Sequence, residues 1–249
     1  MDYSKHVGDV YSTKDCGDLI ITKYCGSRDV YVKFLSTGYE TKTALSSIKN
    51  GCVRDRMTPS VLGVGTLGNE SICKDGQKLR EYTLWFSMLL RCYDDKTHLH
   101  FPSYSSCEVS ENFKYFPYFK EWCNNQVGFK ENGWQLDKDI LVKGNKLYSE
   151  DTCCFVPPEI NSLIIKTDRN RGSYPVGVSY DKSLRKFSAS LRVGSKSTRL
   201  GMFNADLEAF LAYKQAKEAH IKEVANKWMG AISVNVYNAL LNYSVSYDD

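Results

Sequence analysis

Two aspartates separated by one residue, Asp137 and Asp139, are the side chains with the clearest chemical potential in this sequence. In an extended strand, residues i and i+2 point to the same side, so both carboxylates could reach one hard cation such as Mg²⁺. Lys138 lies between them, and Asn161 follows further along. The alternative is a pair of surface aspartates in a turn, ion-paired with Lys138 or Lys143. The sequence leaves both interpretations open.

Two histidines, His98 and His100, could supply a general base, because an imidazole titrates near neutral pH. They would share a face if the polar stretch 94–106 were an extended loop. No partner with a fixed position is evident for either ring, so exposed histidines without a chemical role are the favoured interpretation.

Nine cysteines are spread along the chain, and the only close pair, Cys153 and Cys154, is adjacent and not spaced as C-x-x-C. An odd count favours free thiols over disulfides, and the wide spacing favours buried thiols over a zinc site. The polar first residues lack the apolar segment of a signal peptide, and no apolar run is long enough to span a bilayer. We therefore expect a cytoplasmic protein, in the host cytoplasm if a phage encodes it, with no membrane partner.

Basic residues gather in one stretch although the formal net charge is only +4. Such a patch is the electrostatic pattern expected for phosphate binding, and a solvated charged face is the alternative. The stretch contains Arg169, Arg171, Lys182, Arg185, Lys186, Arg192, Lys196 and Arg199.

The basic stretch belongs to a segment, 171–230, that predicts three strands and a helix. Residues 186–193 alternate between apolar and polar side chains, as in a half-buried strand, with shorter strands predicted on either side at 176–180 and 198–203. Asn204 is placed to cap a helix whose apolar stripe runs from Leu207 to Trp228. We expect the helix to cover one face of the sheet, and residues 231–249 to form a C-terminal tail.

Two further units precede this module. Residues 1–70 read as a strand-rich module, with strands predicted at 18–24 and 30–35, and its basic residues allow an accessory DNA contact. Residues 80–163 open with an apolar helical stripe around Trp85 and Met88. A second helix, within 112–122, is rich in aromatic residues and carries Pro117 in its first turn.

The C-terminal segment resembles the APETALA, or ethylene-response-factor, type of DNA-binding domain. The resemblance covers about sixty residues and rests on Gly177-Val-Ser-Tyr180, Lys186-Phe-Ser-Ala189, Leu200-Gly-Met-Phe203 and Glu208-Ala-Phe-Leu-Ala-Tyr213. It implies that the sheet binds duplex DNA through the face not covered by the helix. The expected contact residues are Tyr180, with Ser179 as its alternative in the first strand, Arg185, Lys186, Ser188, Ser190, Arg192, Lys196 and Arg199.

The middle unit resembles the HNH-type homing endonucleases that phages carry. The resemblance rests on the helix with Trp85, Met88 and Arg91-Cys-Tyr93, on Leu136-Asp-Lys138, and on Tyr148-Ser-Glu-Asp-Thr-Cys153. It implies a small unit of the ββα-metal type that cleaves DNA with Mg²⁺ or another divalent cation. Asp137, Lys138, Asp139 and Asn161 would be catalytic, with Asp137 and Asp139 as metal ligands.

The sequence departs from the HNH pattern at two positions. Lys138 stands where the family has its general-base histidine, and Thr152 stands where it has an asparagine. A lysine is charged at neutral pH unless it is desolvated, so it is a poor base, although it could stabilise a pentacovalent phosphate. The sequence therefore leaves endonuclease activity undecided.

The expected architecture is a multi-domain α+β protein: a strand-rich N-terminal module, an HNH-like unit, and a three-stranded antiparallel sheet packed on one helix. The first functional hypothesis is a monomeric homing-type DNA endonuclease that binds duplex DNA. The alternative is a regulatory or architectural DNA-binding protein whose HNH-like unit no longer cleaves.

Overall fold

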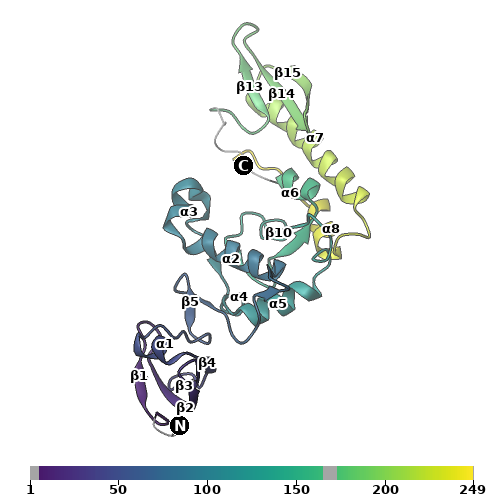
Figure 1. Ribbon diagram of the computed structural model, residues 1–249. Helices are drawn as coiled ribbons and strands as arrows, with labels where there is room; N and C mark the ends of the chain where they lie inside the picture. The colour runs from purple at the N-terminus through teal and green to yellow at the C-terminus, as the bar shows by residue number, and fades with distance from the viewer. Residues whose placement is uncertain (1–5, 165–172, 249) are drawn as a thin grey trace. The chain divides into compact units, whose positions relative to one another are not determined.

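The alternation of apolar side chains near the amino terminus builds an antiparallel sheet, as the sequence predicts. The computed structural model describes residues 6–164 and 173–248. Four strands pair in chain order (Figure 1): β1 (Val10–Ser12), β2 (Asp18–Gly26), β3 (Asp29–Phe34) and β4 (Glu40–Thr43). Val30, Val32 and Phe34 are fully buried on one face, in a core that includes Ile48 of α1 (Leu45–Lys49). The other face of the sheet is solvent-exposed.

Two short hairpins lead from this sheet to a group of helices. The hairpins are β5 (Pro59–Val61) with β6 (Gly65–Thr66) and β7 (Cys73–Lys74) with β8 (Gln77–Lys78). The helices are α2 (Arg80–Tyr93), α3 (Asp95–His100), α4 (Glu111–Lys114) and α5 (Phe116–Asn125), with the 3-10 turn η1 at Pro102–Tyr104. Trp85 is buried against Phe116 and donates its indole N–H to the carbonyl of Phe113 over 2.7 Å. The predicted aromatic helix therefore serves the core.

A strand, loop, strand and helix follow the aromatic helix. β10 (Gln135–Asp137) pairs antiparallel with β12 (Cys154–Val156), and α6 (Pro158–Ile164) follows directly. Between these strands, β11 (Leu147–Tyr148) pairs in parallel with β9 (Glu108–Val109) of the helical region. Cys153 and Cys154 are buried, and none of the nine cysteines forms a disulfide. Burial raises the pKa of the Cys154 thiol, so that group stays neutral.

The C-terminal sheet has the three antiparallel strands that the sequence predicts. They are β13 (Val178–Asp181), β14 (Lys186–Val193) and β15 (Lys196–Phe203), and α7 (Asp206–Lys227) lies along one face (Figure 1). Ala189, Leu191, Phe210 and Tyr213 are buried between them. The expected cap at Asn204 is wrong: the N-cap is Ala205, which has no side chain that can accept a hydrogen bond.

The residues expected to form a C-terminal tail are part of the fold. α8 (Val234–Leu241) contacts α7, and Val245 enters the core beneath the C-terminal sheet. Lys214 of α7 donates to Ser244 Oγ at 2.7 Å and to the carbonyl of Val245 at 2.6 Å, and the Tyr247 hydroxyl donates to Asp206. The assignment of 231–249 as a tail is therefore corrected.

The chain divides into two compact units. The first contains the residues up to Cys123 together with Lys146–Glu150, and the second contains Asn124–Asn145 and the residues from Asp151 onward. The stretch 80–163, predicted as one HNH-like unit, is thus split, with α2 to α4 in the first unit and the β10–β12 hairpin and α6 in the second. In the part of the chain that the structure describes, no helix is both long and apolar enough to cross a bilayer.

Candidate nucleic-acid interface

The strand register divides the C-terminal sheet into a helix-covered face and a free face. Residues paired across neighbouring strands point to the same side of an antiparallel sheet. Ser190 pairs with Arg199, and Arg192 pairs with Ser197, so each arginine stands beside a serine of the neighbouring strand. The free face comprises Ser179, Asp181, Lys186, Ser188, Ser190, Arg192, Ser197, Arg199 and Met202.

A bulge in β15 places Arg199 on the same face as Arg192 of β14. The register shifts between Ala189, which pairs with Gly201, and Ser190, which pairs with Arg199, so Leu200 has no partner in β14. The extra residue changes the alternation along β15, and Leu200 is half-buried against the core beneath the sheet. Without the bulge, Arg199 would share the side of Ala189.

Two of the predicted contact residues are placed differently from expectation. Tyr180 pairs with Phe187, and their ring centroids lie 5.0 Å apart, so Tyr180 is on the helix-covered side and Ser179 takes its place on the free face. Ser188 is on the free face but only 8% exposed. The prediction that Tyr180 lies on the free face is wrong, and Ser188 cannot meet a large ligand directly.

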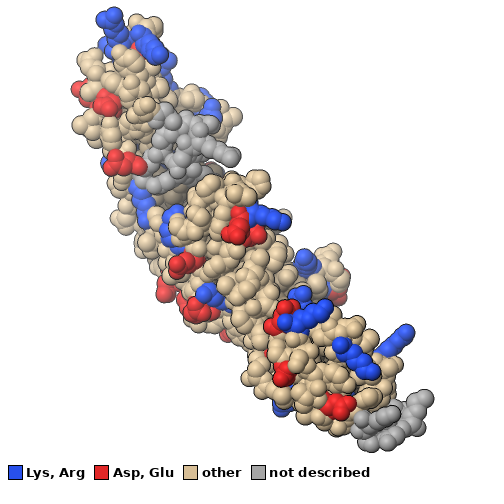
Figure 2. Space-filling view, turned by 90° about the vertical axis from the view of Figure 1, so that its left-hand side faces the viewer, with Lys and Arg blue, Asp and Glu red and all other residues tan. Residues whose placement is uncertain are grey.

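The arginines of the free face are uncommitted. Arg192 and Arg199 are exposed, and neither forms a hydrogen bond or ion pair with another described residue. Residues 178–203 contain six basic side chains and one acidic one, whereas α7 carries four lysines against four acids. Positive charge is therefore concentrated in the sheet, and Figure 2 shows Lys and Arg side chains at the top of the view, where the sheet ends.

Asp181, the one acidic residue within 178–203, stabilises the turn that follows β13. Asp181 accepts hydrogen bonds from the Ser183 hydroxyl at 2.6 Å and from the Ser183 and Leu184 amides at 2.9 and 3.1 Å. These bonds, the Ser183 hydroxyl first, lower the pKa of Asp181, so it is ionised at neutral pH. Arg185 follows with a φ of 51°, and Arg185, Lys186 and Lys196 are exposed at the ends of the strands. Those three cations face solvent at the margins of the sheet.

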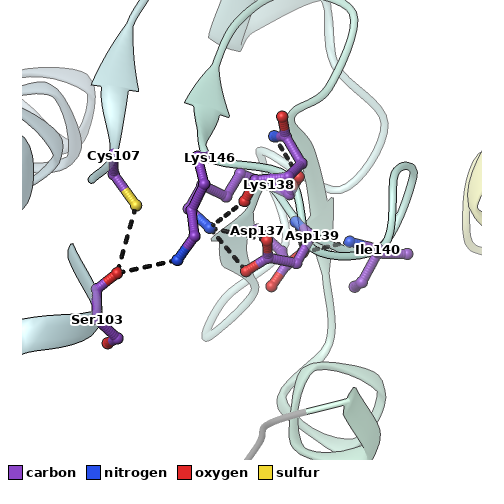
Figure 3. Close-up of polar contacts among 8 residues, drawn as sticks. Ser103, Cys107, Asp137, Lys138, Asp139, Ile140 and Lys146 are labelled. Carbon is purple, nitrogen blue, oxygen red and sulfur yellow. Dashed lines mark hydrogen bonds and ion pairs between the residues drawn. The ribbon is translucent and has the colours of Figure 1, made fainter. Parts of the chain in front are cut away.

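Lys138 is the centre of a separate cluster in the loop after β10. Its side chain is 7% exposed, and its ammonium donates to both carboxylate oxygens of Asp139 at 2.8 Å and to the Asn145 carbonyl at 2.9 Å (Figure 3). The Asn145 side chain in turn donates to the Lys138 carbonyl at 2.9 Å. The ammonium thus sits among three oxygens of its own loop, and these contacts close the loop.

Asp137 is also satisfied by its own chain. Its Oδ1 accepts the amide N–H groups of Asp139 and Ile140 at 2.7 and 2.8 Å, which is an Asx-type turn (Figure 3). Strand β10 ends at Asp137, so the rule that places residues i and i+2 on one face does not extend to Asp139. Burial raises the pKa of the Asp137 carboxyl, and the two amide donors offset only part of that effect.

These side chains are a poor fit for a divalent cation. Mg²⁺ requires ionised oxygen ligands in nearly octahedral geometry. Both oxygens of Asp139 are engaged by Lys138, Oδ1 of Asp137 accepts two backbone amides, and the Asn161 amide donates to the Gln135 side chain at 2.5 Å. Among the described residues, no group of three or more His, Cys, Asp and Glu side chains is arranged to hold a metal ion.

The two histidines lie in a helix and not in an extended loop. α3 begins after Asp94, whose side chain caps it by accepting the Thr97 amide at 2.8 Å. Successive positions in a helix are about 100° apart, so His98 and His100 point to different sides. The His98 ring bonds the Arg91 carbonyl at 2.9 Å. The expected extended loop is therefore wrong, and His98 has a fixed partner that the sequence did not reveal.

Several residues that tie the second unit together were missed by sequence reasoning. Lys143 donates to the Ser244 carbonyl at 2.8 Å, and Glu159 accepts from Lys227 and from the Trp228 indole at 2.7 Å each. These bonds link the β10 loop and α6 to the C-terminal segment and to the end of α7. Of the predicted basic stretch, Arg169 and Arg171 lie outside the described residues.

Comparisons with known proteins add no relative. No protein-family model matches the chain, and searches of the curated proteins and of the solved structures found no significant match.

Proposed function

We propose that this chain binds duplex DNA through the free face of β13, β14 and β15. The observation that carries the proposal is the pair Arg192 and Arg199. Both are exposed on one face of the sheet and form no hydrogen bond or ion pair with another described residue, while α7 covers the other face. An exposed guanidinium without a protein partner retains all its donors for a ligand.

The dimensions of the sheet match a DNA major groove. Three strands spaced about 4.8 Å apart span roughly 10 Å, and the groove is about 12 Å wide. Small side chains, Ser179, Ser190 and Ser197, alternate with the arginines on the free face, so the backbone can approach base edges closely. Bulky residues in these positions would hold the arginines away from the bases.

The charged residues divide into two roles. Arg192 and Arg199 lie within paired strands and are the candidates for bidentate contacts with guanine. Arg185, Lys186 and Lys196 lie at or next to the turns, and we assign them to phosphate contacts, which position the protein without reading sequence.

The endonuclease activity expected from the HNH resemblance draws less support from the side chains. The order β10, loop, β12 and α6 is the order that a ββα-metal unit requires. However, an ammonium group occupies the centre of the loop, and Asp139 and Asn161 are bonded to neighbouring side chains. The non-catalytic alternative therefore fits the geometry better, and cleavage stays a prediction to be tested.

One experiment tests both duplex binding and DNA cleavage. The full-length protein is titrated into fluorescently labelled duplex DNA of mixed sequence at several NaCl concentrations, and anisotropy reports binding. The same mixtures are incubated with Mg²⁺, with Mn²⁺ or with EDTA and resolved on a denaturing gel. We expect salt-dependent binding without strand cleavage. Absence of binding at the lowest salt would overturn the proposal, and cleavage that EDTA abolishes would establish the endonuclease instead.

A further inference from the structure

Three side chains form a cross-strand row on the exposed face of the N-terminal sheet: Lys23 of β2, Tyr31 of β3 and Lys42 of β4. Lys23 pairs with Tyr31, and Tyr31 pairs with Lys42. The two ammonium nitrogens lie 5.5 and 5.8 Å from the centroid of the Tyr31 ring, one on each side in the strand order. The row therefore presents two ammonium groups and one aromatic ring to solvent.

The acids near this row do not remove its capacity to bind an anion. Lys42 is 3.0 Å from Asp29, and Lys33 on the same face is 3.3 Å from Glu40, with the side chains of all four residues at least 40% exposed. Exposed ion pairs contribute roughly 0–1 kcal/mol, so either lysine can exchange its carboxylate for another anion at little cost. Lys23 forms no ion pair with a described residue.

Two more cations border an open hollow beside this row. The hollow has a volume of about 620 Å³ and begins where the β2–β3 turn meets α1. Its lining consists of Ser27, Arg28, Ala44, Leu45, Ser46 and Lys49. Arg28 directly precedes Asp29, and Ala44 lies two residues after Lys42, so the hollow continues the cationic region along the edge of the sheet.

We infer that this exposed face is a second contact surface for the DNA duplex, which binds the phosphate backbone without reading sequence. The inference rests on the proposed function and extends it to the first unit. Lysine ammonium groups act as point charges that attract phosphate but lack the bidentate donor geometry that reads a base edge. The Tyr31 ring lies between the two lysines, and its hydroxyl can donate to a phosphate oxygen.

The test is the salt dependence of binding by full-length variants. The slope of log K against log [NaCl] counts the phosphates that a protein neutralises, at about 0.9 per contact on duplex DNA. We expect Lys23→Ala/Lys42→Ala to reduce the magnitude of this slope by roughly 2 and to weaken binding to all duplex sequences alike. Lys23→Arg/Lys42→Arg should restore the slope. The control Lys74→Ala/Lys130→Ala removes the same charge from exposed positions elsewhere and should leave the slope unchanged.

A measurement on the unmodified protein guards against a folding effect of the variants. Lysines are acetylated with and without duplex DNA, and mass spectrometry reports which are protected. Protection of Lys23 and Lys42, with Lys74 unprotected, supports the inference. If Arg192→Ala/Arg199→Ala weakens binding while Lys23 and Lys42 show neither protection nor a change of slope, the second surface is refuted and the proposed function stands. If the wild-type protein does not bind duplex DNA, the proposed function itself fails.

Discussion

The C-terminal sheet and the β10 loop use charged side chains in opposite ways within one compact unit. On the sheet, Arg192 and Arg199 are exposed and form no hydrogen bond or ion pair with another described residue, although the charge of Arg199 helps to lower the pKa of Asp181. In the loop, the ammonium of Lys138 is buried and bonded to three oxygens of its own chain. Charge left to solvent is available for recognition, whereas charge satisfied internally maintains the fold. This contrast is the reason that we propose a binding function for the sheet and not for the loop.

The largest expected effect is on duplex binding, from removing the two exposed arginines of the sheet. Arg192→Ala/Arg199→Ala should weaken duplex binding by about 2–6 kcal/mol, because each lost guanine contact costs roughly 1–3 kcal/mol. Anisotropy titrations at fixed salt measure it, and Lys130→Ala/Lys222→Ala is a control of equal charge. Equal losses in the two double variants would mean that only net charge matters, and the distinction between sheet and loop would fail.

The second largest effect is expected on stability, from removing the buried charge of Lys138. Lys138→Met should lower the free energy of unfolding by about 1–3 kcal/mol, because Asp139 and the Asn145 carbonyl lose their donor. The figure is below that for a fully buried pair since the Asp139 side chain is 42% exposed and regains water. Urea denaturation measures the change, with the exposed Lys130→Met as control. Full stability of Lys138→Met would show that the loop does not depend on its ammonium.

A smaller effect is expected at Asp137. Its folded pKa is raised by burial, so the folded state binds the proton at higher pH than the unfolded state does. The contribution of Asp137 to stability should therefore fall as pH rises from the unfolded value near 3.8 through the raised folded pKa, opposite in sign to the contributions of Glu150 and Glu159, whose pKa values are lowered. Asp137→Asn keeps an oxygen to accept the Asp139 and Ile140 amides and should remove this dependence, changing stability at neutral pH by about 1 kcal/mol or less. An unchanged pH profile in urea melts would contradict the assignment.

The smallest effect is expected from divalent cations. A metal bound only by the folded state at 100 times its Kd adds about 2.7 kcal/mol of stability. Because Lys138 already occupies the oxygens of the loop, Mg²⁺ or EDTA should shift the melting temperature by less than about 1 °C. Differential scanning calorimetry checks this, and a rise of several degrees with Mg²⁺ but not with Na⁺ of equal ionic strength would reveal a metal site in the folded protein.

Much of the local structure could be predicted because burial imposes a period on the sequence. Val30, Val32 and Phe34 alternate as in a strand, and Trp85, Met88 and Leu89 follow a helical stripe, and all six are buried as expected. The face of Tyr180 was predicted wrongly although the pattern contains the signal: Tyr180 is two residues from Val178, and both pair with residues on the helix-covered side. The alternating apolar residues Tyr243, Val245 and Tyr247 likewise indicate a segment that packs on the core in place of a tail.

The candidate metal site could not be settled from the sequence, because its geometry depends on competition between nearby groups. Asp137 and Asp139 satisfy a simple spacing rule, but Asp137 bonds the amides that follow it and Asp139 bonds Lys138. Both bonds form within a few residues of chain, so they cost little loop-closure entropy. Sequence spacing alone does not reveal which carboxylates form hydrogen bonds within their own loop.

The most direct test of the central claim locates the DNA on the protein. A photocrosslinking amino acid is placed either at Ser197, which lies on the free face beside Arg192, or at Leu207, which is 54% exposed on α7. The full-length protein is irradiated with labelled duplex DNA, and the crosslinked fraction is measured. The proposed interface predicts efficient crosslinking from Ser197 and little from Leu207. Crosslinking mainly from Leu207 would contradict it.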